Sequence, residues 1–292
     1  MGGLYPSAAV CILRPMIRIR PMTRDDLALG MRLKTQAGWN QTEADWRRYL
    51  RLGGNGSFVA ELDGAAVGTT VTFIFESVAW VAMVLVDEAV RGRGIGTALM
   101  QHALAFLDGR GVKSVRLDAT ALGRPIYEKL GFVTEYQLAR YQGVLPAAAD
   151  PGGVVSLPRM IFVLRLDWEA TQTVRIPLLM RMREEFESAF RAVLRNGELI
   201  AYLASRPGAN AVQIGPCAAR EESAGRLLLT DACARLGGQR VFIDVPLPNR
   251  AAVAAVESMG LTAQRRLLRM GRGEPVRENL ELLWASSGPE KG

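Results

Sequence analysis

The stretch Arg91-Gly92-Arg93-Gly94-Ile95-Gly96-Thr97 decides the fold of this chain. It lies between an apolar run, Val78–Val86, and a helical pattern at residues 98–107. Glycine at 92, 94 and 96 lets backbone N–H groups surround an anion without interference from side chains. The helix that follows directs the positive end of its dipole to the same place. The stretch therefore predicts a phosphate-binding loop between a strand and a helix.

The glycine spacing separates this loop from two common phosphate loops. Alternating glycines do not match the Gly-x-Gly-x-x-Gly of dinucleotide-binding folds, and no Gly-Lys-Ser/Thr triplet follows. Arg91-x-x-Gly94-x-Gly96 is instead the spacing of the pyrophosphate loop of the Gcn5-related N-acetyltransferases (GNAT), and the chain resembles that family. Residues 125–132 add a second motif, with Tyr127 and Gly131-Phe132, similar to the tyrosine-bearing helix and Gly-Phe turn that close the family's acyl-CoA site.

The resemblance covers residues 16–143 and implies a mixed α/β fold with a mostly antiparallel, twisted sheet flanked by helices. The predicted elements that match this fold are strands at Ile17–Pro21 and 115–119, helices at 25–36 and 43–50, and a hairpin of 58–61 with 66–73 that turns at Asp63-Gly64.

A second copy of the same pattern follows residues 144–158, which are rich in Pro, Ala and Gly and form a predicted linker. Residues 85–104 align without a gap on 214–233, an offset of 129 (214 − 85), and Arg140 meets Arg269 at the same offset. A second hairpin is predicted at Asn196-Gly197. We therefore expect two tandem GNAT folds, an acetyl-CoA-binding domain at 16–143 and a second domain at 159–284.

The second copy lacks the residues that its position would require. Arg220-Glu221-Glu222-Ser223-Ala224-Gly225 stands in place of the glycine loop, and its two carboxylates would repel a pyrophosphate. Val256 stands in place of Tyr127. Residues 37–41 and 244–246 extend the resemblance to a subfamily with an active first unit and a degenerate second one. We expect the second domain to serve as a scaffold or to contribute to the acceptor site.

The resemblance also implies which residues hold the acyl donor, expected to be acetyl-CoA. In the family, backbone N–H groups of the strand before the loop hold the pantetheine and the thioester oxygen. Thr120 stands where the family often has asparagine, seven residues before the tyrosine, whereas the second half retains Asn249 there. The expected contacts are Met83, Val84, Leu85, Val86, Arg91, Gly92, Arg93, Gly94, Ile95, Gly96, Thr97, Thr120 and Tyr127.

Tyr127 is the main catalytic candidate, because by resemblance its phenol lies near the sulfur and protonates or hydrogen-bonds the leaving thiolate. A tyrosine that only covers the helix–sheet junction is the alternative. For the general base we consider Glu76, whereas Asp118 could instead hold the cation of the substrate. Either carboxylate could equally be a solvated strand end, and a water chain that carries the proton to solvent would need neither. His102, the single histidine, lies on the helix after the loop, away from the thioester, and is not expected to be catalytic.

The acceptor is expected to meet residues from both halves. Trp39, Asn40 and Trp46 fall where the family forms its acceptor-side wall, although tryptophans are as often core residues. Asp244, Pro246 and Asn249 would face a cleft between the domains if the repeat geometry holds. The acceptor amine itself is left open, with a small molecule favoured over a protein lysine.

Composition narrows the class of protein. The chain has 292 residues, of which 49% are hydrophobic, and its net charge of +7 suits an anionic ligand. The basic residues are dispersed, so no nucleic-acid partner is expected, and the longest apolar run is too short to cross a membrane. Cys11, Cys217 and Cys233 have no metal-binding spacing, which predicts no metal site and a cytoplasmic location. Residues 1–15 are expected to be peripheral, and the chain after Trp284 to be loose.

The leading hypothesis from the sequence is a monomeric N-acetyltransferase that uses direct attack of a primary amine. A non-catalytic acyl-CoA sensor or scaffold is the alternative, because no general base is evident. Acyl-chain length and oligomeric state are not fixed by the sequence.

Overall fold

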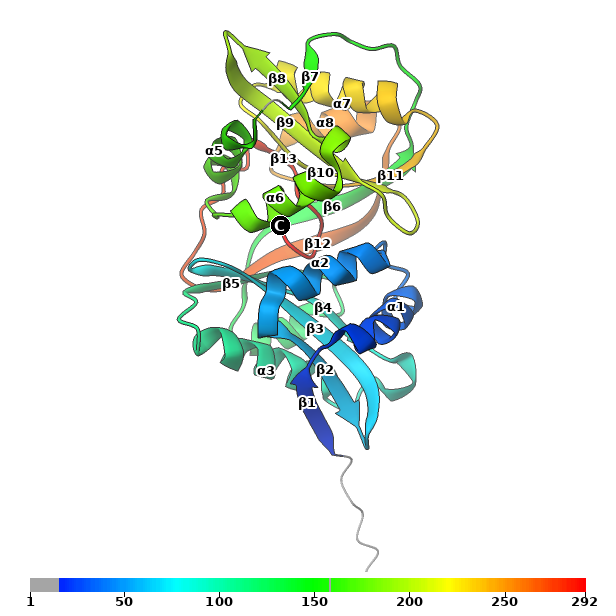
Figure 1. The fold of residues 1–292 in the computed structure, drawn as a ribbon, viewed down its shortest axis with the longest axis vertical. Helices are drawn as coiled ribbons and strands as arrows, with labels where there is room; N and C mark the ends of the chain where they lie inside the picture. Colours follow the sequence, from blue (N-terminus) through cyan, green and yellow to red (C-terminus); the bar gives the residue numbers. More distant parts are fainter. Residues whose placement is uncertain (1–15, 158) are drawn as a thin grey trace, which may run out of the picture.

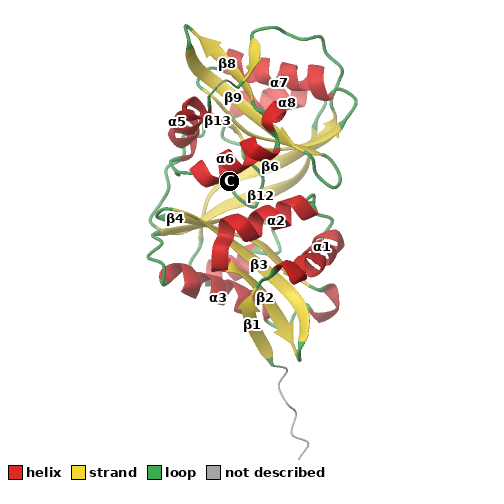
Figure 2. Cartoon of the chain, in the orientation of Figure 1, coloured by secondary structure: helices red, strands yellow, loops and turns green. Residues whose placement is uncertain are grey.

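The computed structural model describes residues 16–157 and 159–292. The expectation for residues 1–15 lies outside the described residues. Figures 1 and 2 show two halves, one above the other, each with helices packed against strands of one continuous sheet. The predicted mixed α/β class, with a largely antiparallel sheet flanked by helices, is confirmed.

The elements of the two halves follow the same order. The first half contains β1 (Ile17–Pro21), η1 (Arg24–Asp26), α1 (Leu27–Gln36), α2 (Glu43–Gly53), η2 (Gly54–Gly56), β2 (Ser57–Leu62), β3 (Ala65–Phe75), β4 (Val78–Val86), η3 (Glu88–Val90), α3 (Ile95–Asp108), β5 (Ser114–Ala119), α4 (Arg124–Lys129) and β6 (Val133–Val144). The second contains β7 (Val154–Ser156), α5 (Met160–Thr171), α6 (Ile176–Glu185), η4 (Glu187–Ala189), β8 (Arg191–Arg195), β9 (Glu198–Arg206), β10 (Val212–Ala219), α7 (Glu222–Leu236), β11 (Arg240–Pro246), α8 (Arg250–Ser258), β12 (Thr262–Gly273) and β13 (Leu283–Ala285).

Both predicted hairpins form, and their turn residues explain why. Asp63 and Gly64 have φ of 50° and 86°, and Asn196 and Gly197 have φ of 51° and 81°. Two consecutive residues with positive φ define the turn that matches the twist of an antiparallel hairpin, and Asn, Asp and Gly tolerate this conformation best.

The last long strand of each half pairs with the other half. The order around the centre of the sheet is β5-β12-β6-β11, so β12 of the second half lies between β5 and β6 of the first. Figure 1 shows β6 and β12 side by side between the halves. This exchange joins the halves through backbone hydrogen bonds. The division into domains at 16–143 and 159–284 stays a prediction, and in space each half contains a strand of the other.

The 129-residue offset holds for part of the repeat only. β6 and β12 start at Val133 and Thr262 and end at Val144 and Gly273, both at that offset. The gap-free alignment is wrong across the loop between strand and helix, because residues 87–94 connect β4 to α3 whereas only 220–221 connect β10 to α7. The predicted linker is also more ordered than expected, since β7 within it pairs with β8.

Three apolar cores hold the molecule together. One lies under α3 in the first half and one under α7 and α8 in the second. The third is shared, because it contains Trp46, Phe73 and Trp80 of the first half together with Leu166 and Tyr202 of the second. The two halves are therefore packed against each other through a shared hydrophobic core.

The prediction that the chain after Trp284 is loose is wrong. Ser286, Ser287, Glu290 and Lys291 are almost fully buried between the halves. The end of the chain, marked C in Figure 1, lies between α2 and α6. Buried hydrogen bonds and ion pairs replace the solvent that these polar residues would otherwise contact.

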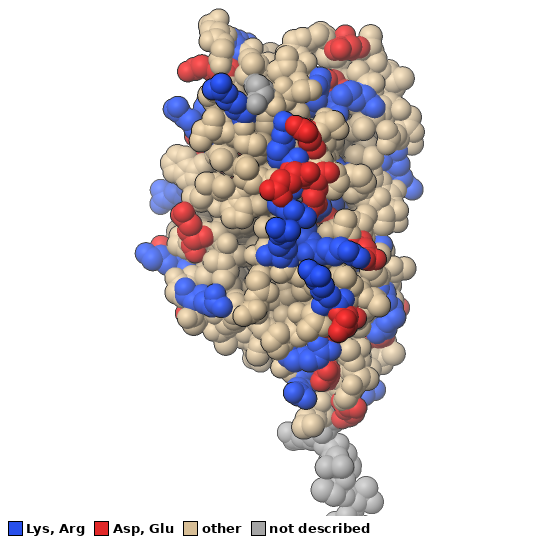
Figure 3. All heavy atoms as spheres, viewed as in Figure 1, with Lys and Arg blue, Asp and Glu red and all other residues tan. Residues whose placement is uncertain are grey.

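The surface shown in Figure 3 carries basic and acidic side chains interspersed along its middle, not one basic patch. No helix among residues 16–157 and 159–292 is long and apolar enough to span a bilayer.

Candidate functional site

A gap between β4 and β5 forms the centre of the candidate site. The two parallel strands pair only at Val78–Trp80 with residues 114–116 and then diverge. The part of β4 from Val81 to Val86 therefore has no strand partner on the β5 side.

A bulge in β4 lies beside this gap. Met83 has a φ of 52°, and the register with β3 shifts between the pairs Thr69–Leu85 and Val71–Ala82. A bulge redirects backbone groups that would otherwise point at the neighbouring strand. The irregular backbone at Met83 and Val84 thus faces the opening where a ligand would meet β4.

The glycine loop presents free backbone donors. Among the described residues, no acceptor is found for the N–H groups of residues 91–94. Ile95, Gly96 and Thr97 form the first turn of α3, whose N–H groups have no intrahelical acceptor. Gly94 precedes the helix in the left-handed conformation, with a φ of 80°. The loop and helix end together suit a pyrophosphate.

Gly96 fits this interpretation for a second reason. Its φ is not positive, and a Cβ at this position would meet only Val86 Cγ2, at 3.8 Å. The fold itself therefore does not require glycine here, whereas a ligand that approaches the backbone closely does. Arg91 and Arg93 are exposed, and Arg91 Nε donates to Val86 O at 3.1 Å, which holds the loop against the end of β4.

Tyr127 lies on the segment that follows β5, the strand on the other side of the gap. α4 carries it, and its ring packs edge-on against Phe132, with centroids 6.1 Å apart. Burial raises the pKa of Tyr127 to about 12, so the phenol keeps its proton at neutral pH. No hydrogen-bond partner for its hydroxyl is found within the described parts of the chain. Thr120 begins the turn before α4, where its Oγ1 accepts from Gly123 N at 3.3 Å.

Asp118 does not stand free beside the site. Its carboxylate accepts from Arg269 Nε at 2.6 Å and Nη2 at 3.2 Å, with both side chains fully buried. Burial raises the pKa of Asp118 to about 6, and the charge of Arg269 acts in the opposite direction. Arg269 also contacts Glu278 and stacks on Trp80, so Asp118 belongs to a buried cluster.

Glu76 is excluded as the general base by its position. It is exposed in the turn between β3 and β4. Five residues of β4, 78–82, lie between it and Met83, so the two positions are on the order of 20 Å apart. His102 is exposed on α3 and packs edge-on against Phe58, with ring centroids 4.5 Å apart.

The three acceptor-side residues predicted in the first half have structural roles. Asn40 is buried, and its Oδ1 accepts from Asn210 N and Ala211 N at 2.9 and 3.1 Å, while Nδ2 donates to Ala211 O at 3.0 Å. Its hydrogen-bonding capacity is used to join the halves. Trp46 is fully buried in the shared core, and Trp39 packs partly buried beside it. Asn40 and Trp46 thus have no free surface for an acceptor.

The predicted second-half acceptor residues are likewise occupied. Asp244 is fully buried and pairs with Arg140 through Oδ1 at 2.9 Å and Oδ2 at 2.8 Å. Pro246 is buried at the end of β11 beside Leu138. Asn249 caps α8 and donates to the backbone of residues 281 and 283. An open acceptor site at these three residues is therefore wrong for this conformation.

The corresponding gap in the second half is filled by a strand that sequence reasoning missed. β13 pairs with β10 through Cys217–Ala285 and Ala218–Leu283. The apolar run of residues 282–285 was the available signal, but its pairing partner is distant in sequence. The loop before α7 is also much shorter, because only residues 220–221 connect β10 to α7, and it contains no glycine.

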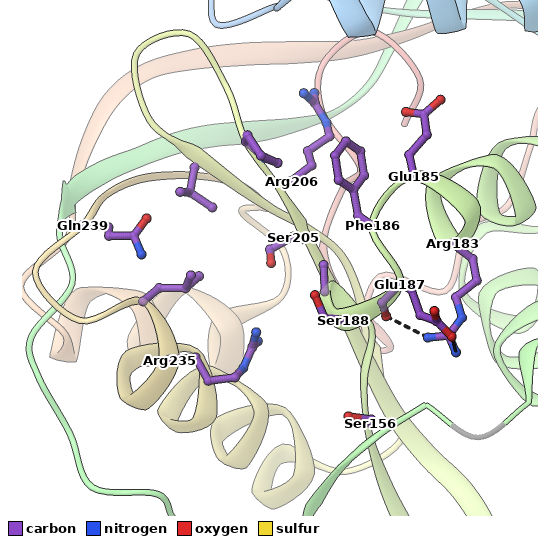
Figure 4. A pocket seen from close by; sticks show the side chains of 14 residues that line it. Ser156, Arg183, Glu185, Phe186, Glu187, Ser188, Ser205, Arg206, Arg235 and Gln239 are labelled. Atoms are coloured by element: carbon purple, nitrogen blue, oxygen red, sulfur yellow. Dashed lines mark hydrogen bonds and ion pairs between the residues drawn. The ribbon is translucent and has the colours of Figure 1, made fainter.

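Two cavities lie away from both gaps. One of about 800 Å³, shown in Figure 4, lies at the opposite end of β10 and α7 and is lined by Arg183, Phe186, Arg206 and Arg235, among others. Its arginines are already paired, Arg183 with Glu187 and Arg235 with Asp231. The other, of about 330 Å³, lies at the start of β4 and β5. Neither adjoins the glycine loop, which we consider the candidate site on chemical grounds.

The described residues include two of the three cysteines. Cys217 and Cys233 are buried, and burial raises the pKa of both thiols. No group of three or more His, Cys, Asp or Glu side chains in residues 16–157 and 159–292 could hold a metal ion.

Family models and curated relatives identify both halves. The acetyltransferase (GNAT) family model matches residues 25–132, and an acetyltransferase (GNAT) domain model matches residues 163–285. Holothin acyltransferase of a Pseudoalteromonas species is 25% identical over 87% of each chain. An uncharacterized N-acetyltransferase of Methanocaldococcus jannaschii is 30% identical over 39% of this chain and 59% of its own.

Solved structures agree in fold. A putative acetyltransferase from Pyrococcus horikoshii has a TM-score of 0.84 at 22% identity and covers 99% of each chain. A tandem GNAT protein from the clavulanic acid biosynthesis pathway has a TM-score of 0.62 at 15% identity, over 89% of this chain and 99% of its own. Enzymes of this fold use acyl-CoA donors. The chain belongs to the GNAT acetyltransferase family, with two GNAT domains in tandem, and is an acyltransferase.

Proposed function

We propose that the protein transfers the acetyl group of acetyl-CoA to a primary amine by direct attack, and that the first half carries out the reaction. One observation supports this more than any other: among the described residues no strand fills the gap between β4 and β5 beside the glycine loop, whereas β13 fills the matching gap in the second half. A single working acyl-CoA site per chain follows from this difference.

The residues of the first half fit an acyl-CoA molecule. The loop of residues 91–97 would hold the pyrophosphate through its N–H groups, with Arg91 and Arg93 beside it. The unpaired edge of β4 from Met83 to Val86 would hydrogen-bond the extended pantetheine arm as a strand would. Acyl-CoA supplies the activated thioester. A backbone donor aimed at the thioester oxygen contributes on the order of 3 kcal/mol to the transition state.

Tyr127 is proposed to donate its proton to the departing thiolate. A pKa of about 12 keeps the phenol protonated at neutral pH, and its hydroxyl has no competing partner among the described residues. The proton of the attacking ammonium is proposed to leave through water. Glu76 is too distant, and Arg269 already occupies the carboxylate of Asp118.

The acceptor is proposed to be a small molecule that meets second-half residues. Trp80 lies three residues before Met83 on β4, on the side covered by the shared core. Gly292 packs against its ring so closely that a Cβ on Gly292 would lie 2.3 Å from Trp80 Cζ2. This side of β4 is covered, which suits a small amine better than a lysine on a protein surface.

Calorimetric titration of acetyl-CoA tests the donor site. The wild type should bind one equivalent per chain, and Gly96→Glu should abolish binding, because a carboxylate would enter the anion site. Gln101→Glu, which adds the same charge on an exposed part of α3, is the matched control and should bind normally. Two equivalents would contradict the single-site proposal, and no binding by the wild type would contradict acetyl-CoA as the donor.

Turnover is then measured as release of the CoA thiol with a panel of amines. The relative named holothin acyltransferase is a reason to include holothin among the acceptors and longer acyl groups among the donors. Faster turnover with a longer acyl-CoA would show that the longer acyl group, and not acetyl, is the preferred transferred group.

A further inference from the structure

Residues 281–292 are called here the closing segment, and its first part, residues 282–286, lies in the gap of the second half. β10 and β11 pair only at Val212–Ile214 with residues 241–243, and β13 enters where they diverge. Ala219 N donates to Leu282 O at 2.9 Å on one wall, and Ser286 N donates to Asp244 O at 2.9 Å on the other. The segment thus lies beside β10 at the position that no strand occupies beside β4 in the first half.

Asn249 holds the segment by a dedicated pair of hydrogen bonds. Its Nδ2 donates to Glu281 O and Leu283 O, both at 3.1 Å, while its Oδ1 accepts from Ala252 N at 3.0 Å to cap α8. Thr120 is the matching residue in the first half and begins the turn before α4 without an amide to donate. The residue type that the first half lacks is therefore used in the second half to bind peptide.

Small residues of the second half are shaped to the segment. Trp284 is buried, and a Cβ on Gly225 would lie 2.3 Å from its Cε2. A Cβ on Gly215 would lie 2.0 Å from Ser286 O. Gly225 is the counterpart of Gly96 on the matching helix, where a Cβ would meet only Val86 Cγ2 at an ordinary contact distance. Gly96 leaves the N-terminal end of α3 uncovered in the first half, whereas Gly225 leaves room for the indole ring of Trp284 in the second.

The segment then continues to the first half. Glu290 Oε1 accepts from Tyr49 Oη at 2.9 Å and from Arg206 Nη2 at 2.8 Å, and so joins α2 to β9. Lys291 is fully buried against Glu290 at 2.5 Å, and Arg175 donates to the carbonyl oxygen of Gly292. These polar anchors of the segment are thus met by residues of both halves.

We infer that the second half is a peptide-binding site, with the closing segment as its resident ligand. The ligand class is an extended peptide with a Leu-Trp pair, small residues after it and a Glu-Lys pair at its far end. Recognition combines added-strand hydrogen bonds, an indole pocket and a buried ion cluster. The inference goes beyond the proposed function and does not depend on it, because it concerns binding of peptide and not acyl transfer.

The tethered segment has a high effective concentration, so a free peptide competes only after the chain is cut. A site for a specific protease is inserted between Glu274 and Pro275, which are both exposed, and the folded full-length protein is cleaved there. Native mass spectrometry should find the released fragment still bound. A labelled synthetic peptide of residues 275–292 should then exchange with it at one equivalent per chain.

Matched variants identify the contacts. Asn249→Asp keeps the acceptor that caps α8 but loses both donors to the segment, and should weaken peptide binding about tenfold or more. Asn196→Asp makes the same chemical change in an exposed hairpin and should leave binding unchanged. A peptide that carries Trp284→Ala should bind the wild-type protein no more tightly than the wild-type peptide binds the Asn249→Asp protein.

The inference is overturned if the cleaved protein keeps its circular dichroism spectrum yet loses the fragment and fails to bind the peptide. Equal affinity for wild-type and Trp284→Ala peptides overturns it as well. If cleavage unfolds the protein, hydrogen exchange of the uncut chain decides instead. Asn249→Asp should then accelerate exchange at residues 282–286 selectively, and an unchanged rate there would refute the site.

Discussion

Arg269 and Asp118 form a fully buried, two-contact ion pair between the halves, with N–O distances of 2.6 and 3.2 Å. Arg140 and Asp244 form the corresponding pair in the other direction, at 2.9 and 2.8 Å. Each arginine lies on an exchanged strand, and each aspartate lies on the strand beside it. The repeat thus places two matching ion pairs at the junction of the halves.

Removal of Arg269 should destabilise the protein strongly. Arg269→Leu leaves the carboxylates of Asp118 and Glu278 buried without this counter-charge, a loss of about 3–5 kcal/mol in the free energy of unfolding. Arg272→Leu, on the same strand, breaks an exposed pair with Asp108 and should cost less than about 1 kcal/mol. Urea unfolding measures both variants, and equal losses would contradict the structural role of the buried pair.

Glu278 should make stability depend on acidic pH. Burial favours the neutral form, but the charges of Arg116 and Arg269 outweigh it and lower the pKa of Glu278 from 4.5 to about 2. Because the folded pKa lies below the unfolded one, this stabilisation is present above pH 4.5 and is lost as the pH falls towards 2. By linkage it amounts to about 3 kcal/mol at neutral pH.

Glu278→Gln provides the measurement for this linkage. The difference in unfolding free energy between wild type and variant should be large at pH 7 and should shrink progressively at pH 4 and pH 3. A difference that stays constant over this range would show that Glu278 is not the titrating group.

Tyr127→Phe should separate catalysis from binding. Loss of the proposed acid lowers kcat by about 10²-fold or more, while acetyl-CoA affinity changes little. Tyr141→Phe is a matched control, since burial also raises the pKa of Tyr141 to about 12 but its hydroxyl bonds Glu257 on the second half. The kcat of the wild type should not fall through loss of the Tyr127 proton as the pH is raised to about 10, because the phenol stays protonated over this range. An unchanged kcat in Tyr127→Phe would exclude the acid role.

The same substitution should have opposite consequences at matching positions of the two halves. Gly96→Ala adds a methyl group where there is room for it and should leave the melting temperature unchanged or slightly raised. Gly225→Ala would overlap the ring of Trp284 and should cost about 1–3 kcal/mol. Thermal unfolding tests the pair, and Trp284→Ala combined with Gly225→Ala should lose less than the two single changes added together. Equal tolerance of alanine at both sites would mean that the indole does not fill the position shown.

The sequence by itself determined the family, the two tandem folds and the phosphate-loop hypothesis. These depend on local features: alternating glycines fix the loop, and Asp63-Gly64 and Asn196-Gly197 fix their turns through backbone conformation. The lost glycines of the second loop were also readable, because repulsion between carboxylates and phosphate needs no tertiary information.

Only the tertiary structure decided how the halves share strands, and which candidate side chains are free. Asn40, Asp118 and Asp244 are polar residues in suggestive places, but their partners lie on segments distant in sequence, so no local pattern shows that their hydrogen bonds are already used. The closing segment is the clearest case. Its polar residues resemble a solvated tail, and only the unpaired edges of β10 and β11, together with buried opposite charges, make burial favourable.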